Sequence, residues 1–447
     1  MASISKAQNT ARQPAFKGWG QGLAWLGLAL WGLSATAHAQ DLVIESWRKD
    51  DQILWDKVLI PAFQKLHPGI RLKFKPEEPL AYDAKLEGRL ATRRAGDLIF
   101  CRPFDENVRM QVKGYFVPMK EQELSNFSQK ARMAWTSDDG KTTHCMPVAY
   151  VIHGLFYNQK IFGDLNLKEP VTVDELLALL SQISAHSANN ATQGKNPITP
   201  LALGTADMWE ANQVVFTGMG PNFWEGEKAR QGLMKRTAKF TDPGFIKAWQ
   251  LMAQFKPYMH AQQNEMSNSD VQLLFATGNA AIYPTGSWDI DFLRSTSFAY
   301  KKPIELGVFK PPVEKRGQAC HISVHPDFGI GVNRDSPHQE AAFKFIAWLA
   351  TADFAQLMTD TLTGYFTLSN HPVTVSDPLS QQMLKWRQEC QDTTRLNTQK
   401  INRVWPSMED ELRYINVKVL NQDITPEQAG QYIQSVHEKN AYINATP

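Results

Sequence analysis

Short strand-like and helix-like segments alternate near the start of the chain, and this alternation constrains the fold more than any other feature of the sequence. Strand segments alternate apolar and polar residues or are short apolar runs, whereas helix segments carry apolar residues three and four positions apart. Three strands with two intervening helices are expected at residues 41–47, 51–66, 70–75, 82–95 and 97–101. Strands and helices in this order predict an α/β domain with a mostly parallel sheet.

Later segments keep both element types, and the length of 447 residues leaves room for two or more domains. Thr172-Val173-Asp174-Glu175 is a capping box that should open a helix over residues 175–183. Further helices are expected at residues 207–217, 245–255, 270–277, 338–349 and 426–438. Further strands are expected at residues 153–157, 201–203, 280–283, 304–309 and 321–332.

Residues 1–39 have the features of a secretory signal peptide. Basic Lys6, Arg12 and Lys17 precede an apolar run over residues 22–33, and the stretch ends in Ala37-His38-Ala39, a small-x-small cleavage pattern. This apolar run is shorter than the roughly 20 residues that a membrane span needs. The sequence therefore predicts cleavage before Gln40 and export of the mature chain to the periplasm.

The charge balance excludes two classes of partner. The chain has 47 basic and 45 acidic residues, but the first 39 residues hold three of the basic ones and no acidic one. The rest of the chain is therefore nearly neutral, which gives no electrostatic basis for binding nucleic acid or for stable membrane attachment.

The residue spacings favour neither a metal site nor common catalytic motifs. Cys101, Cys145, Cys320 and Cys390 are too far apart for a zinc pattern. One or two disulfides are possible in an exported chain, but the pairing stays open, as does the alternative of free thiols. His321 and His325 lack the glutamate of a metalloprotease motif, and no Gly-x-Ser-x-Gly elbow is present. We expect no metal and no cofactor.

Several tryptophans lie where strands and helices should end, beside polar residues. Trp47 closes the first strand, Trp209 follows Asp207, and Trp288 lies between Ser287 and Asp289. A flat aromatic ring can cover the C–H face of a sugar while neighbouring polar groups bind its hydroxyls. These positions therefore indicate a carbohydrate site.

The chain also resembles a known family over nearly its whole length. The resemblance rests on segments that occur in the family's order: "HPGI", "GDLIF", "GYFVPM", "MPVAYVIHGLFYNQKIF", "TVDELLALL", "FATGNAAIYPTGSWD", "GIGVNRDSPHQEAAFKFIAWL" and "ITPEQAGQYIQ". On these segments the chain resembles the extracellular solute-binding proteins of bacterial ABC importers, in the sugar-binding family 1 that includes maltose-binding protein.

This resemblance implies the two-lobe periplasmic-binding-protein fold of type II. Each lobe would be a mixed sheet flanked by helices, with the ligand cleft between the lobes. The N-terminal lobe would comprise residues 40–148 with about 315–368, and the C-terminal lobe about 149–314 with 369–447.

The resemblance also implies a set of ligand-binding residues. They fall at the edge of the first strand, after the "DLIFC" strand, at the crossovers between lobes and in the "GSWD" segment. The implied residues are Glu45, Trp47, Arg102, Asp105, Tyr150, Trp209, Trp288, Asp289, Tyr365 and Phe366. Leu412 stands after Pro406-Ser407-Met408 where maltose-binding protein has a tryptophan, so a mono- or short oligosaccharide fits better than a long maltodextrin.

The implied function is that of a periplasmic binding protein, a monomer that delivers a sugar to ABC permease subunits and catalyses no reaction. One alternative is a binder of a glycerol phosphodiester or another polar solute, for which Arg48 and Arg102 are the candidate cations. A less favoured alternative is a secreted glycosidase, which would need a pair of carboxyl groups such as Glu45 and Asp289.

Overall fold

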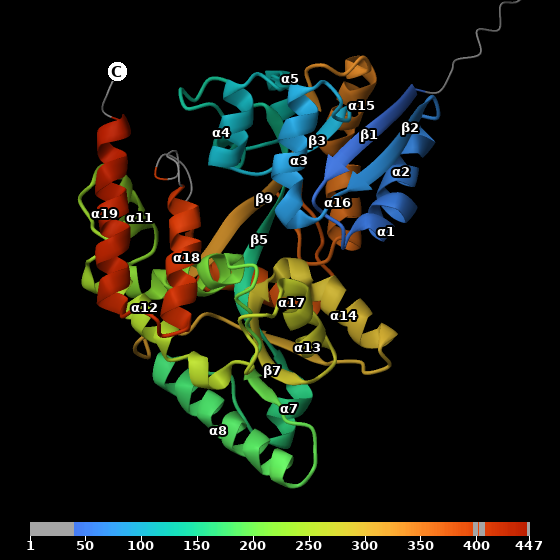
Figure 1. The fold of residues 1–447 in the computed structure, drawn as a ribbon. Helices are drawn as coiled ribbons and strands as arrows, with labels where there is room; N and C mark the ends of the chain where they lie inside the picture. The colour runs from blue at the N-terminus through green and yellow to red at the C-terminus, as the bar shows by residue number, and fades with distance from the viewer. Residues whose placement is uncertain (1–39, 397–400, 402–406, 445–447) are drawn as a thin grey trace, which may run out of the picture. The chain divides into compact units, whose positions relative to one another are not determined.

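The computed structural model describes residues 40–396, 401 and 407–444 (Figure 1), so the predicted signal peptide lies outside the described residues. The first strands follow the predicted order as β1 (Gln40–Ser46), β2 (Ile70–Pro76) and β3 (Leu98–Cys101). The helix predicted between β1 and β2 is continuous but contains a π-helical turn, and α3 precedes β3. Their bounds are α1 (Gln52–Leu54), η1 (Trp55–Leu59), α2 (Ile60–Leu66) and α3 (Pro79–Ala91).

The other predicted strands are present with shifted bounds, because local patterns do not reveal how far a strand stays paired. They are β5 (Cys145–Asn158), β6 (Thr199–Leu201), β7 (Ala280–Gly286), β8 (Leu306–Phe309) and β9 (His321–Asn333). Three short strands were not predicted: β4 (Phe116–Val117), β10 (Phe366–Thr367) and β11 (Gln391–Thr393).

The predicted capping box is confirmed, since Thr172 and Glu175 cap α8 (Val173–Thr192) reciprocally. The other helices before β7 are α4 (Asp105–Val112), α5 (Glu121–Leu124), α6 (Gln129–Arg132), η2 (Met133–Trp135), α7 (Gln159–Asp164), η3 (Ala211–Phe216), α9 (Thr217–Met219), α10 (Pro221–Trp224), α11 (Glu227–Lys235), α12 (Pro243–Ala253), η4 (Lys256–Tyr258) and α13 (Asn268–Ala276). Those after it are η5 (Ser287–Asp289), α14 (Ile290–Ala299), α15 (Gln339–Leu349), α16 (Ala352–Thr361), α17 (Pro378–Glu389), α18 (Met408–Leu420) and α19 (Pro426–Asn444).

The strands form one mixed, hydrogen-bonded sheet with the main order β2-β1-β3-β9-β5-β7-β6. The pairs β1–β2, β1–β3, β6–β7 and β9–β11 are parallel, while β9 runs antiparallel to β3, β4 and β5. The parallel arrangement that the first segments predict holds for β1–β3 only, whereas the mixed sheet that the resemblance implies is confirmed. The antiparallel pairs arise because β9 comes from a distant part of the chain and enters beside β3 from the opposite direction, which local patterns cannot show.

The core divides into separate apolar clusters, and the two longest strands contribute to more than one of them. Val151 of β5 and Phe328 of β9 belong to a cluster built with the first helices and with α15 and α16. Ile152 and Ile322, on the same two strands, pack instead with α13, α14 and α17. β5 and β9 thus connect the two lobes, and the lobe boundaries at particular residues stay a prediction.

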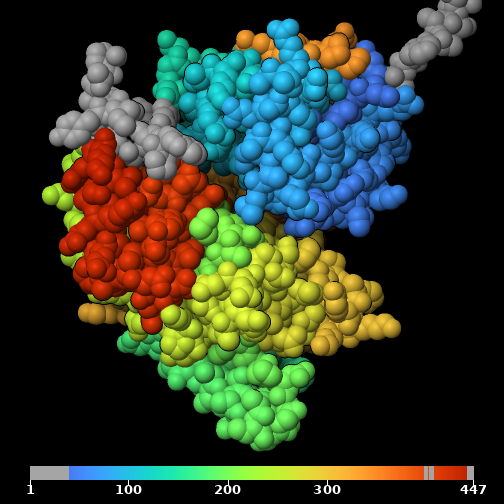
Figure 2. Space-filling model, in the orientation of Figure 1, coloured from blue at the N-terminus to red at the C-terminus, as the bar shows by residue number. Residues whose placement is uncertain are grey.

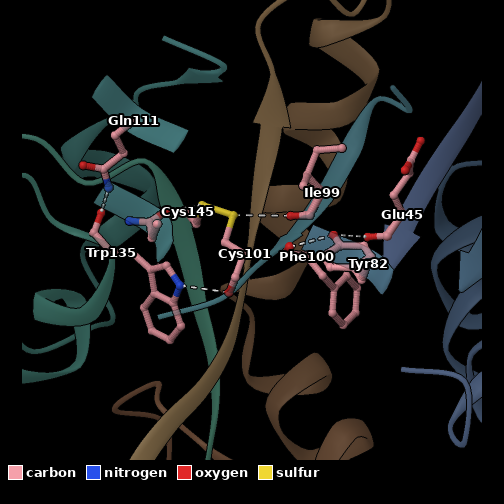
Figure 3. Close-up of a disulfide and its surroundings, with 9 residues drawn as sticks. Glu45, Tyr82, Ile99, Phe100, Cys101, Gln111, Trp135 and Cys145 are labelled. Atoms are coloured by element: carbon pink, nitrogen blue, oxygen red, sulfur yellow. Dashed lines mark hydrogen bonds between the residues drawn. A yellow bond between two sulfur atoms is a disulfide. The ribbon is translucent and has the colours of Figure 1, made fainter. Parts of the chain in front are cut away.

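Both possible disulfides are formed, as Cys101–Cys145 and Cys320–Cys390. Figure 3 shows the first of them, which joins β3 to β5 across the intervening strand β9. A Cβ atom on Gly331 of β9 would lie 2.9 Å from the Cys145 sulfur and 3.0 Å from the Cys101 sulfur. Only glycine leaves room at this crossing, so Gly331 and the disulfide depend on one another.

Side chains of the surrounding helices cover most of β5 and β9 on the face that Figure 2 shows. Among the residues that the structure describes, we find no helix that is long and apolar enough to cross a membrane.

Candidate functional site

A cluster of aromatic and charged side chains lies around β5 and β9 between the two apolar clusters to which these strands contribute. We call it the central cluster. Its members come from the turn after β1, from β5, η5 and β9, and from the segment before β10. They are Arg48, His153, Trp288, His325, Asp327 and Tyr365.

Arg48 is fixed by two carboxylates and one ring. Its Nε donates to Asp51 Oδ2 at 2.6 Å, its Nη1 lies 3.9 Å from Asp327 Oδ2, and its guanidinium lies 4.5 Å from the centre of the Tyr365 ring. Burial alone would lower the pKa of Arg48, but the neighbouring charges, Asp51 first, outweigh it and raise this pKa. The guanidinium is therefore permanently charged and largely committed to these partners.

His153 and His325 form a buried pair between β5 and β9. His153 Nε2 and His325 Nδ1 are 3.1 Å apart, and both side chains are 1% exposed. Burial lowers the pKa of both imidazoles well below the usual value. Both rings are thus neutral at pH 7, so that one nitrogen donates to the other. His325 Nε2 lies 3.8 Å from Asp327 Oδ1 and has no hydrogen-bond partner among the described residues.

Trp288 packs beside this pair and is positioned by the backbone around it. Its ring centroid is 5.1 Å from that of His153 and 6.3 Å from that of His325. The preceding Ser287 accepts from the Ile152 N–H at 3.1 Å, which ties η5 to β5. A Cβ on Gly286 would lie only 1.8 Å from the indole, so glycine is required at the end of β7. The indole itself is only half-buried.

Asp289 accepts hydrogen bonds from three side chains of its own lobe. The donors are Gln272 Nε2 at 2.8 Å, Thr285 Oγ1 at 2.6 Å and the Tyr283 hydroxyl at 3.1 Å. Burial raises the pKa of Asp289 to about 6, although these hydrogen bonds oppose the shift. Ser287, two residues before Asp289, donates to the carbonyl oxygen of Gly364 at 2.5 Å, which ties the segment of Asp289 to that of Tyr365 in the central cluster.

Three of the predicted site residues gather at the edge of β1 and β3, in the N-terminal lobe. Trp47 stacks under the Arg102 guanidinium at 4.3 Å, and Arg102 Nε donates to Asp83 at 2.7 Å. The Glu45 carboxylate accepts from Arg89 Nε and from the Gly96 N–H, each at 2.8 Å. Both Glu45 oxygens are thus used within the lobe, and the role of these residues in ligand binding stays a prediction.

The remaining predicted residues lie apart from this edge. Tyr150 of β5 faces Phe366 of β10 with ring centroids 5.3 Å apart, and its hydroxyl accepts from Arg387 at 2.6 Å. Asp105 is the first residue of α4. Trp209 is half-buried and directly precedes Glu210. The structure thus brings Trp288, Asp289 and Tyr365 into one neighbourhood and leaves the others in separate groups.

Sequence reasoning missed His153, Asp327 and Glu210 as site candidates. His153 and Asp327 interrupt otherwise apolar strands, which is a usable signal, but the motifs pointed instead to aromatic residues at element ends. The sequence pattern suggests His325 only together with His321, as a possible pair of metal ligands. The part of the chain that the structure describes contains no group of three or more His, Cys, Asp or Glu that could hold a metal ion.

Comparisons with known proteins agree with this architecture. A family model for bacterial extracellular solute-binding proteins matches residues 59–381. The multiple sugar-binding protein of Streptococcus mutans is 22% identical over 325 residues, which cover 71% of each chain.

Solved structures of solute receptors have the same fold. The receptor AcbH, described as having an exclusive preference for β-D-galactopyranose, matches with a TM-score of 0.75 at 14% identity, over 90% of this chain and 99% of that one. A chitin oligosaccharide binding protein matches with a TM-score of 0.73 at 19% identity, over 90% and 100%. A sugar transporter from Bacillus licheniformis in complex with stachyose matches with a TM-score of 0.67 at 16% identity, over 90% and 100%.

Proposed function

Because the chain belongs to the bacterial extracellular solute-binding proteins, we propose that it is the substrate-binding component of an ABC importer and captures a mono- or short oligosaccharide. It acts in the periplasm as a monomer after cleavage of the signal peptide, and it delivers the sugar to membrane permease subunits without catalysing a reaction. The relatives described as sugar receptors support this choice of ligand class.

The surroundings of Trp288 are the observation that best supports this proposal. The half-buried indole of Trp288 packs near His325, whose Nε2 has no hydrogen-bond partner among the described residues. Two more buried polar atoms of the central cluster, Asp327 Oδ2 and the Tyr365 hydroxyl, likewise lack such a partner. A flat apolar surface next to such groups suits a sugar, which has an apolar ring face and a rim of hydroxyls. In this proposal the indole stacks on the ring and the polar atoms bind the hydroxyls.

In this proposal, the strands that connect the lobes allow the change in shape that the permease recognises. β5 and β9 contribute residues both to the cluster of the first helices and to the cluster of α13, α14 and α17. Small changes in such connecting strands allow domain closure around a ligand. A closed, ligand-bound form would differ in shape from the free form, and the permease would distinguish the two.

A thermal-shift screen of the mature chain, residues 40–447, tests the proposal. The panel is D-galactose, D-tagatose, stachyose, N,N′-diacetylchitobiose and glycerophosphocholine. A saccharide at a hundred times its Kd should stabilise the protein by about 2.7 kcal/mol. The expected result is a shift with at least one saccharide, which is recovered chemically unchanged. Consumption of the saccharide would indicate an enzyme, and a shift with glycerophosphocholine alone would favour the phosphodiester alternative.

A further inference from the structure

Glu210, which directly precedes η3, carries a buried carboxyl group to which no other described residue donates a hydrogen bond. Its side chain is 1% exposed, and neither carboxyl oxygen has a hydrogen-bond partner among the described residues. The buried carboxylates of Glu45 and Asp289, in contrast, each accept several hydrogen bonds. Leaving a buried polar group without a hydrogen bond destabilises the folded protein, and a charged group more so. A role in folding alone does not account for this residue.

The surroundings of Glu210 connect it to the central cluster. Asp207, three residues before Glu210, accepts from the Asn268 N–H at 2.8 Å, and the Tyr283 hydroxyl lies 3.1 Å from both Asn268 Oδ1 and Asp289 Oδ2. Ser287, two residues before Asp289, donates to the carbonyl oxygen of Gly364 at 2.5 Å, directly before Tyr365 of the central cluster. Glu210 therefore extends the neighbourhood of Trp288 and Tyr365.

Three of the positive groups around these residues are paired within the protein. Arg48 binds Asp51, Arg102 binds Asp83, and Arg413 donates to Glu409 at 2.5 Å. Buried acceptors and hydroxyls without a hydrogen-bond partner among the described residues include both Glu210 oxygens, Asp327 Oδ2, His325 Nε2 and the Tyr365 hydroxyl. Arg413 Nε is a buried donor that also lacks such a partner.

We propose that Glu210 is a ligand-contacting residue whose carboxyl group binds hydroxyl groups of the captured solute. A hydroxyl group can both donate and accept, so it suits the carboxyl group of Glu210 whether or not that group carries a proton, whereas a phosphodiester offers acceptors only. The inference rests on the proposed function and narrows it to a solute that is rich in hydroxyl groups.

Titration calorimetry tests the contact. The saccharide from the panel with the largest melting shift is titrated into wild type, Glu210→Gln, Glu210→Ala and the control Asp97→Asn. Asp97 is also a buried carboxylate, but its oxygens already accept from Val43 N and Ser336 Oγ. Removing the carboxyl group leaves the solute hydroxyl without its buried partner, so we expect about tenfold weaker binding by Glu210→Ala. Glu210→Gln should lose less, and Asp97→Asn should bind like wild type.

Unliganded stability is the second measurement. Neither Glu210 oxygen has a hydrogen-bond partner among the described residues. The substitution Glu210→Leu should therefore raise the melting temperature of the unliganded protein and, at the same time, weaken saccharide binding. Wild-type affinity in Glu210→Ala, or a lower melting temperature in Glu210→Leu, would overturn the inference.

Failure of the proposed function looks different from failure of this inference. If no saccharide stabilises the wild type, the proposed function fails. The melting temperature of Glu210→Leu then shows only whether the carboxyl group stabilises the unliganded protein, and a lower value would also overturn the inference. If a saccharide binds wild type and Glu210→Ala equally well, only the inference fails.

Discussion

The indole of Trp288 meets the imidazole of His153 edge-on, with ring centroids 5.1 Å apart and ring planes inclined by 77°. The two residues come from η5 and β5, so the contact joins the end of one element to a strand that connects both lobes. It fixes the orientation of the indole without covering it, since Trp288 stays half-buried.

Replacement of Trp288 by alanine should weaken saccharide binding at least tenfold. Burying an aromatic face of this size is worth about 1.5 kcal/mol or more, and 1.4 kcal/mol corresponds to tenfold in Kd. Titration calorimetry with the strongest saccharide of the panel measures the effect. Phe298→Ala is the matched control, because that ring is 80% exposed at the end of α14. Equal losses in the two variants would contradict a specific role for Trp288.

Loss of the Cys101–Cys145 disulfide should destabilise the protein. The bridge closes 44 residues of chain, and a loop of this size is typically worth about 2–4 kcal/mol. Urea unfolding of the Cys101→Ser, Cys145→Ser double variant measures the loss of free energy. Gly331→Ala should also destabilise, since its methyl group would contact both sulfur atoms. A double variant as stable as wild type would show that the bridge does not form.

Stability should fall as the pH rises from about 6.5 to 8 because of Glu210. Burial raises the pKa of this group in the folded protein to about 8, above the ordinary glutamate value of 4.5. The folded state therefore holds a proton that the unfolded state has lost, and the associated stability disappears as the pH passes the folded pKa. The slope is at most about 1.4 kcal/mol per pH unit for one group. Melting curves across this range should show the decrease in wild type and less of it in Glu210→Gln.

Acid should destabilise the protein through the buried histidine pair. The pKa values of His153 and His325 lie well below 6.5 in the folded state because burial disfavours the charged imidazole. The unfolded state therefore binds protons first, and stability is lost as the pH falls below about 6.5. Melting temperatures between pH 7 and 5 measure the loss, which should be smaller when both histidines are replaced by glutamine. An equal loss in that double variant would assign the acid effect to other groups.

Local sequence patterns determined most of the elements in this protein. The strand and helix periods near the N-terminus, the Thr172–Glu175 capping box and the aromatic residues at element ends all depend on neighbours a few positions away. The family resemblance added the two-lobe fold, which local patterns alone did not reveal.

Tertiary structure decided what depends on residues far apart in the chain. The antiparallel entry of β9 beside β3, the disulfide pairing and the meeting of His153 with His325 each join segments from distant parts of the sequence. The burial of Glu210 without a hydrogen-bond partner among the described residues is likewise decided by its surroundings. From the sequence alone, a glutamate at this position could equally have been exposed or paired. The period of apolar residues in the sequence predicts on which face of a helix or strand a side chain lies, but the residues that pack against this face are determined only when the whole chain folds.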